Sequence, residues 1–155
     1  MGEALKKRIN QQRFESPAVE AMFNLLIAAD YMAQMAEEIC AEFGISRAQF
    51  NVLRILKGVH PDGHSRCEII KRMLEKAPDV TRLVDRLESQ GLAARDRCKE
   101  DRRLSITRIS LEGIELLEKM APRMKHMGDH FASRVSLRDC RELSRICEGL
   151  YGEPE

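Results

Sequence analysis

The sequence of 155 residues predicts a mainly α-helical fold with one small β-hairpin. Apolar residues recur every three or four positions over most of the chain, which is the spacing of amphipathic helices. One segment, residues 92–110, departs from this spacing, because two short stretches with β character flank a charged run there. The length favours a single domain, residues 1–155, with enough chain to bury a core.

Composition excludes several classes of protein. Hydrophobic residues make up 43% of the chain and charged residues 33%, a balance typical of folded, helix-rich proteins. The lack of Trp argues against a surface that stacks single-stranded nucleic acid. No apolar run approaches the roughly 18 residues of a membrane helix, and residues 1–20 lack the apolar centre of a secretory signal. Five cysteines without CxxC spacing favour reduced thiols, so we expect a cytoplasmic protein with no membrane partner.

The first part of the chain predicts a polar end and one long helix. Residues 1–16 are polar, and we expect them to fray. Apolar residues then recur through residues 17–43, with Ser16 as the cap, Pro17 in the first turn and Gly44 as the stop. A small domain does not need such a long helix for its own core, so a dimer seam is favoured over a simple core helix.

Three shorter helices follow. Ser46 is the expected cap of the first of them, "RAQFNVLRILK". Ser65 and Glu68 are spaced as a capping box for the second, "RCEIIKRML". Pro78 stands before the third, "DVTRLVDRLESQ", which ends at Gly91. Its apolar positions fall on one side, which we expect to face the core: Val80, Leu83, Val84 and Leu87.

The C-terminal part predicts a hairpin and two more helices. "LAAR" and "LSITRIS" are the expected strands, and "DRCKEDRR" forms the long tip between them. Ser110 and Gly113 open the next helix, which Pro122 should bend or interrupt. A last helix, "SLRDCRELSRICEGLYG", ends this region, and residues 111–151 are the expected second dimerisation segment.

Positive charge is concentrated in one third of the chain. Residues 65–110 contain twelve Lys or Arg and eight Asp or Glu, a net charge of +4, which leaves −3 for the remainder. Two short helices followed by a charged hairpin have the outline of a winged helix-turn-helix. In that fold the second helix enters the major groove of DNA, and the hairpin, or wing, reaches the backbone or the minor groove. The sequence therefore predicts a DNA-binding lobe at residues 45–110 and double-stranded DNA as its partner.

Arg82 and Arg86 lie four residues apart, so they share one face of the predicted recognition helix. Arginine side chains on that face can reach bases or phosphates together. The wing supplies further cations for the DNA backbone. We expect DNA contacts from Ser65, Arg66, Lys76, Asp79, Thr81, Arg82 and Arg86 of the helix pair and from Arg97, Lys99, Asp101, Arg102 and Arg103 of the wing.

The segment "VTRLVDRLESQGLAARDRCKEDRRLSITRISLEGIELLEK" resembles the core of a MarR-family transcriptional regulator, and the resemblance runs from about Ile45 to Met120. The resemblance implies a homodimer with interlocking terminal helices and an Asp101 side chain that braces Arg103 in the wing. We expect a repressor that binds a palindromic operator without a cofactor and is relieved by a small-molecule effector in a crevice beside the dimerisation helices. In one departure, residues 76–78 replace the Ser or Asp that the family often has there, so the usual side-chain cap should be missing.

Other interpretations remain open at this point. The wing is also compatible with a solvated charged loop, and Arg82 and Arg86 with surface ion pairs to Asp79, Asp85 or Glu88. The same fold also serves protein-interaction adaptors. The chain has no nucleophile elbow, phosphate loop or zinc-protease motif, so we expect no enzymatic activity.

Cysteine and histidine residues suggest sensor functions as further alternatives. Cys98 lies between two cations, which favour a thiolate, so it is a candidate oxidant sensor. His126 and His130 are spaced to share a metal-binding face, but no further ligand at fixed spacing supports a metal site. Cys140 and Cys147 lie seven residues apart in the last helix, where we expect them in the core.

Overall fold

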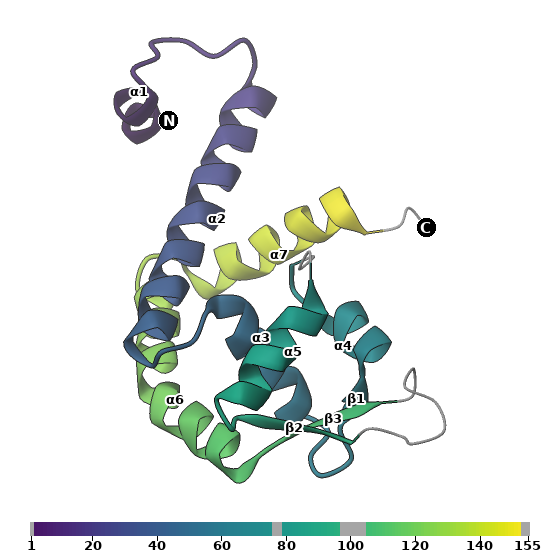
Figure 1. Cartoon of the computed structure of the whole chain (residues 1–155). Helices are drawn as coiled ribbons and strands as arrows, with labels where there is room; N and C mark the ends of the chain where they lie inside the picture. Colours follow the sequence, from purple (N-terminus) through teal and green to yellow (C-terminus); the bar gives the residue numbers. More distant parts are fainter. Residues whose placement is uncertain (1, 76–78, 97–104, 153–155) are drawn as a thin grey trace.

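The computed structural model describes residues 2–75, 79–96 and 105–152 (Figure 1). The elements, in chain order, are α1 (Glu3–Ile9), α2 (Pro17–Glu42), α3 (Arg47–Lys57), β1 (His64–Ser65), α4 (Arg66–Arg72), α5 (Val80–Ser89), β2 (Ala93–Asp96), β3 (Ile106–Ile109), α6 (Leu111–Ala132) and α7 (Leu137–Tyr151). The predicted fold class, mainly α with a small β wing, is confirmed. The predictions made for Lys76, Arg97, Cys98, Lys99, Asp101, Arg102 and Arg103 lie outside the described residues.

The long helix α2 has the predicted ends. The Ser16 hydroxyl oxygen accepts a hydrogen bond from the Val19 N–H at 3.3 Å, and Pro17 occupies the first turn, where its missing N–H costs nothing. Gly44 follows the helix with a φ of 73°, a left-handed conformation that glycine adopts without strain. α2 lies side by side with α6 along its C-terminal half (Figure 1).

The prediction that residues 1–16 fray is wrong, because this segment contains α1. The Leu5 side chain is buried, and the Phe14 ring lies 6.4 Å from the Phe23 ring of α2 between centroids. A helix of this length is unstable alone, so contacts with the rest of the chain must hold it. A short polar helix held by such contacts shows little periodic spacing of apolar residues, so the sequence does not predict it.

The helix-turn-helix lobe, which we define as α3, β1, α4, α5, β2 and β3, surrounds the main hydrophobic core. α3 contributes three fully buried side chains to this core, and α6 closes it from one side. The buried residues that form it are Cys40, Ile45, Val52, Leu53, Leu56, Ile69, Val80, Val84, Leu87, Ala93, Ile109, Leu117 and Met120. Because α2 and α6 add residues to the same core, the lobe and the long helices form one packed unit.

The two predicted strands of the wing are paired. β2 and β3 are antiparallel, with Ala93 opposite Ile109 and Asp96 opposite Ile106. A third strand, β1, pairs with the other edge of β3 and was not predicted, since two residues are too few for a periodic pattern. β1 follows the turn at Gly63, whose φ is 79°.

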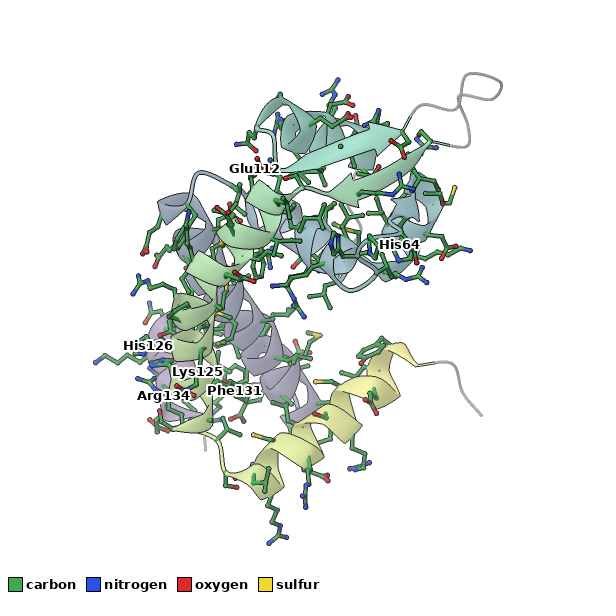
Figure 2. All side chains as sticks on the ribbon, turned by 90° about the horizontal axis from the view of Figure 1, so that it is seen from below. His64, Glu112, Lys125, His126, Phe131 and Arg134 are labelled. Carbon is green, nitrogen blue, oxygen red and sulfur yellow. The ribbon has the colours of Figure 1, made fainter. Side chains whose placement is uncertain are left out.

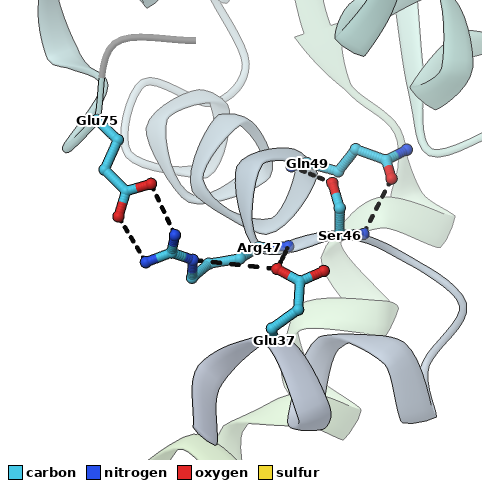
Figure 3. Close-up of polar contacts among 5 residues, drawn as sticks. All are labelled: Glu37, Ser46, Arg47, Gln49 and Glu75. Carbon is cyan, nitrogen blue, oxygen red and sulfur yellow. Dashed lines mark hydrogen bonds and ion pairs between the residues drawn. The ribbon is translucent and has the colours of Figure 1, made fainter. Parts of the chain in front are cut away.

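Ser46 caps α3 and Ser65 caps α4, as predicted, but the capping box predicted at α4 is not closed. α3 begins with a complete capping box, in which Ser46 and Gln49 each accept from the other's backbone N–H at 3.2 and 3.0 Å (Figure 3). At α4 the Ser65 hydroxyl oxygen accepts from the Glu68 N–H at 3.3 Å. The Glu68 carboxylate, however, binds Lys71 and Arg72 instead of closing the box. These two cations hold the pKa of Glu68 below its usual value.

Both predicted C-terminal helices, α6 and α7, are present, and α7 differs from the prediction. Pro122 lies inside α6 without dividing it. Figure 2 shows α6 running from Glu112 beside the sheet to Phe131 at the opposite end. Within α7, all of which is described, no residue is buried. Cys140 and Cys147 are therefore only partly covered, and their predicted place in the core is wrong for the single chain. Within the described ranges, no helix has the length and apolar character needed to cross a membrane.

Candidate nucleic-acid interface

α5 has the two-sided character that a recognition helix requires. Val80, Val84 and Leu87 are buried against the lobe, and they recur at three- and four-residue steps. Arg82 and Arg86 are exposed on the outer side, as predicted from their spacing. The apolar face fixes the helix while the cationic face remains available to a partner.

Asp79 supplies the cap that we expected to be missing, and that expectation is wrong. The helix begins at Val80, so Asp79 takes the N-cap position, where its Oδ1 accepts from the Arg82 N–H at 3.1 Å. Its Oδ2 also lies 3.1 Å from Arg82 Nε. The Arg82 side chain is 80% exposed, and an ion pair this exposed contributes about 1 kcal/mol or less. A phosphate can therefore compete for Arg82 at low energetic cost.

Two further predicted residues meet where α4 passes α5. Arg66 Nη1 donates to Thr81 Oγ1 at 3.3 Å, which links the start of α4 to the first turn of α5. The Ser65 hydroxyl is occupied as the cap of α4. The structure thus brings Arg66 and Thr81 together on the lobe surface and uses Ser65 to cap α4.

Arg95 of β2 is a residue that sequence reasoning missed. Its Nη2 lies 2.7 Å from Asp85 Oδ1 and 3.3 Å from Glu88 Oε2, and its side chain is only 16% exposed. Arg95 therefore neutralises two carboxylates of α5 and joins the helix to the wing. Among the described residues, no carboxylate lies within ion-pair distance of Arg86. The only signal in the sequence was a basic residue in the strand that follows the helix.

A cavity of about 380 Å³ opens beside α5 and was not predicted. Side chains from three separate segments form it, so no single motif could reveal it. Four apolar or small side chains and six polar ones line the cavity: Ala48, Met73, Leu74, Leu83, Arg47, Asn51, Glu75, Asp79, Arg82 and Arg86. The guanidinium groups of Arg82 and Arg86 thus line the side of this cavity that α5 forms.

The histidines of the lobe lie far from those of α6. Figure 2 shows His64 in the helix-turn-helix lobe and His126 toward the distant end of α6. His130 Nε2 is 3.4 Å from the Tyr31 hydroxyl of α2, so this ring contacts the neighbouring helix. Within the described part of the chain, no three His, Cys, Asp or Glu side chains gather as a metal site requires.

Cys40 and Cys67 should differ in reactivity. Burial, reinforced by the nearby Glu37 carboxylate, raises the pKa of the Cys40 thiol to about 11, whereas Cys67 is exposed on α4. We expect a thiol reagent at neutral pH to modify Cys67 and to spare Cys40 until the protein unfolds. Peptide mass mapping before and after denaturation checks this. Equal labelling of both thiols in the native state would contradict the burial of Cys40.

Sequence comparison places this lobe among known regulators. A model described as MarR family matches residues 43–104. The uncharacterized HTH-type transcriptional regulator YdgJ of Bacillus subtilis (strain 168) is 29% identical over 100 residues, which cover 64% of this chain. The match spans 60% of the length of that relative.

Solved structures extend the likeness to nearly the whole chain. CouR from Rhodococcus jostii RHA1, solved with bound p-coumaroyl-CoA, shares the fold with a TM-score of 0.75 at 15% identity, over 92% of this chain and 99% of that one. A MarR transcription factor from Planctomyces limnophilus has a TM-score of 0.69 and is 34% identical, over 88% of this chain and 98% of that one. With both the sequence and the fold shared over this length, the chain belongs to the MarR family of transcriptional regulators.

Proposed function

We propose that the protein is a transcriptional repressor that binds a palindromic operator as a homodimer and releases it when a small molecule binds. The observation that carries DNA binding is the outer face of α5, where Arg82 and Arg86 are exposed above a buried apolar side. Such a helix fits the major groove, where arginine reads guanine or contacts phosphate. The predicted contacts of the wing tip are part of the same proposal.

The uncovered apolar residues of the terminal helices support the homodimer. Soluble monomers rarely expose a row of large apolar side chains, because each one favours burial. α7 exposes Leu137, Leu143, Ile146, Leu150 and Tyr151, and α2 exposes Met22, Leu26 and Tyr31. A second copy covering these residues would place two recognition helices about a two-fold axis, the symmetry of a palindrome.

A small-molecule effector is supported by fold likeness and by a physical requirement. CouR is described as a transcriptional repressor and has been solved with p-coumaroyl-CoA and with a 23-mer DNA duplex. For the present chain, an effector would have to bind the DNA-free arrangement more tightly than the DNA-bound one, since equal affinity shifts no population.

Substitution of Arg86 tests the DNA-binding proposal. In a fluorescence titration with a duplex selected from a random pool by the wild-type protein, we expect Arg86→Gln to weaken binding by about 1–3 kcal/mol. Because Arg86 is exposed, the thermal midpoint should stay unchanged. Lys119→Gln on α6 makes the same change in net charge and should leave the affinity nearly intact. If Arg86→Gln bound the duplex as tightly as the wild type, α5 would not be the helix that contacts DNA.

A further inference from the structure

Arg47, the first residue of α3, contacts acidic residues from two other segments (Figure 3). Its guanidinium forms a two-point contact with Glu75, with Nη1–Oε1 at 2.5 Å and Nη2–Oε2 at 2.7 Å. On its other side, Glu37 Oε2 of α2 accepts from the Arg47 backbone N–H at 3.2 Å and lies 4.0 Å from Nε. Arg47 thus joins α2 to the segment that follows α4.

The segment after α4 has a second tie to α3. The Leu74 N–H donates to Asn51 Oδ1 at 3.0 Å, one turn along α3 from Arg47. The Leu74 side chain is 81% exposed, whereas Met73 before it packs against the core. Beyond Met73, polar contacts with α3 hold Leu74 and Glu75, and Asp79, four residues beyond Glu75, caps the recognition helix.

The geometry of this contact makes it stronger than an ordinary surface ion pair. Planar two-point contacts between arginine and a carboxylate are among the strong charge-assisted hydrogen bonds, and they set orientation as well as distance. Arg123 makes a similar two-point contact with Glu42, which ties α2 to α6, but the Arg47 side chain is less exposed, at 33% against 51%. Among the described residues, Arg47 and Arg123 each pair with a glutamate of α2. Arg47 also pairs with Glu75, which lines the same cavity as Asp79 and Arg82 at the start of the recognition helix.

We propose that Arg47 is a positioning residue that transmits the placement of α2 to the start of the recognition helix α5. The inference rests on the proposed function, because it concerns how well α5 is held for DNA. Arg47 acts through Glu75 and makes no contact with the phosphates. A shift of α2, such as an effector would cause, changes the Glu37–Arg47 contact and thereby the approach of α5 to the groove.

Substitution of Glu75 distinguishes positioning from simple electrostatics. If Glu75 acted only through its charge, Glu75→Gln would strengthen DNA binding, because one negative charge near a polyanion is lost. Positioning predicts the opposite sign. We expect Glu75→Gln and Arg47→Gln each to weaken binding about fivefold, and the double variant to weaken it no further, since each removes the same contact.

The salt dependence of binding supplies a readout that loss of stability would not change. With the full-length protein and the selected duplex, the slope of log affinity against log salt should be the same for Arg47→Gln and the wild type. Arg86→Gln, by comparison, should lower the slope if Arg86 meets a phosphate. Arg123→Gln is the matched control, because it removes the other α2 ion pair and should leave DNA affinity unchanged.

Three results would overturn the inference: tighter binding by Glu75→Gln, additive losses in the double variant, or a reduced salt slope for Arg47→Gln. The last result would make Arg47 a direct phosphate contact. Failure of the wild-type protein to select any duplex would instead refute the proposed function itself. Thermal unfolding of each variant, run alongside, identifies any loss of binding that comes from unfolding.

Discussion

Replacing Gly113 by alanine should destabilise the protein by about 1–3 kcal/mol, the usual range for overpacking, although alanine is the better helix former. A Cβ at position 113 would overlap the Leu92 carbonyl oxygen and approach Ile109 Cγ1 at 2.8 Å. The Leu92 carbonyl also accepts from the Ser110 N–H at 3.1 Å, so the backbone there cannot retreat without losing this bond. α6 would have to move away from the sheet. Urea unfolding monitored by circular dichroism should show the lower midpoint.

Gly128 provides the matched control in the same helix. Apart from the adjoining residues and backbone of its own helix, no described heavy atom lies within 4 Å of a Cβ built at Gly128. Alanine there should therefore add up to about 1 kcal/mol of stability through helix propensity alone. If both substitutions stabilised the protein equally, the close approach of α6 to Leu92 would be wrong.

A charge in the apolar face of α7 should prevent dimerisation. Ile146 is 48% exposed in the single chain, and in the proposed dimer it lies in the seam. Glutamate at this position would bury an unpaired carboxylate, which costs several kcal/mol, so Ile146→Glu should raise the dimer dissociation constant by roughly a hundredfold or more. Sedimentation equilibrium or light scattering measures the mass directly. Operator affinity should fall as the dimer dissociates, because the two recognition helices are no longer linked for binding to two half-sites.

Ser144→Glu on the same helix introduces the same charge at a polar, exposed position. We expect this variant to remain dimeric. A wild-type protein that is monomeric at micromolar concentration, or an Ile146→Glu variant that is still dimeric, would show that α7 does not form the seam.

Most helices could be predicted because each carried its own local signals. Ser16, Pro17 and Gly44 mark the ends of α2, and Ser110 caps α6 through the Gly113 N–H at 3.0 Å. Such signals are short-range hydrogen bonds and φ preferences, and they act independently of the rest of the fold. β1 was missed because its pairing partner, β3, lies far along the chain. α1 was missed because Leu5 and Ile9 are its only large apolar residues, too few for a periodic pattern.

The residues of the candidate site likewise divide into those that local spacing predicts and those that depend on distant partners. Arg82 and Arg86 were predicted because helical spacing alone places them on one face. Arg95 and Arg47 were missed because their partners lie in other elements, and spacing along the chain does not show which surface charges meet in space. The missing cap was an error of one residue, since the prediction began the helix at Asp79 and sought its cap among residues 76–78, whereas Asp79 is itself the cap.

The contact between Arg95 and α5 has a consequence for how affinity for a polyanion arises. From Asp79 to Ser89 the chain contains three acidic side chains and two basic ones, a net charge of −1. As a free peptide, this helix would be repelled by nucleic acid. Once β2 packs against it, Arg95 screens Asp85 and Glu88 and leaves the outer arginines dominant. Attraction to DNA is thus a property of the folded lobe. Local unfolding of the lobe would abolish it even with every DNA-contacting residue still present in the sequence.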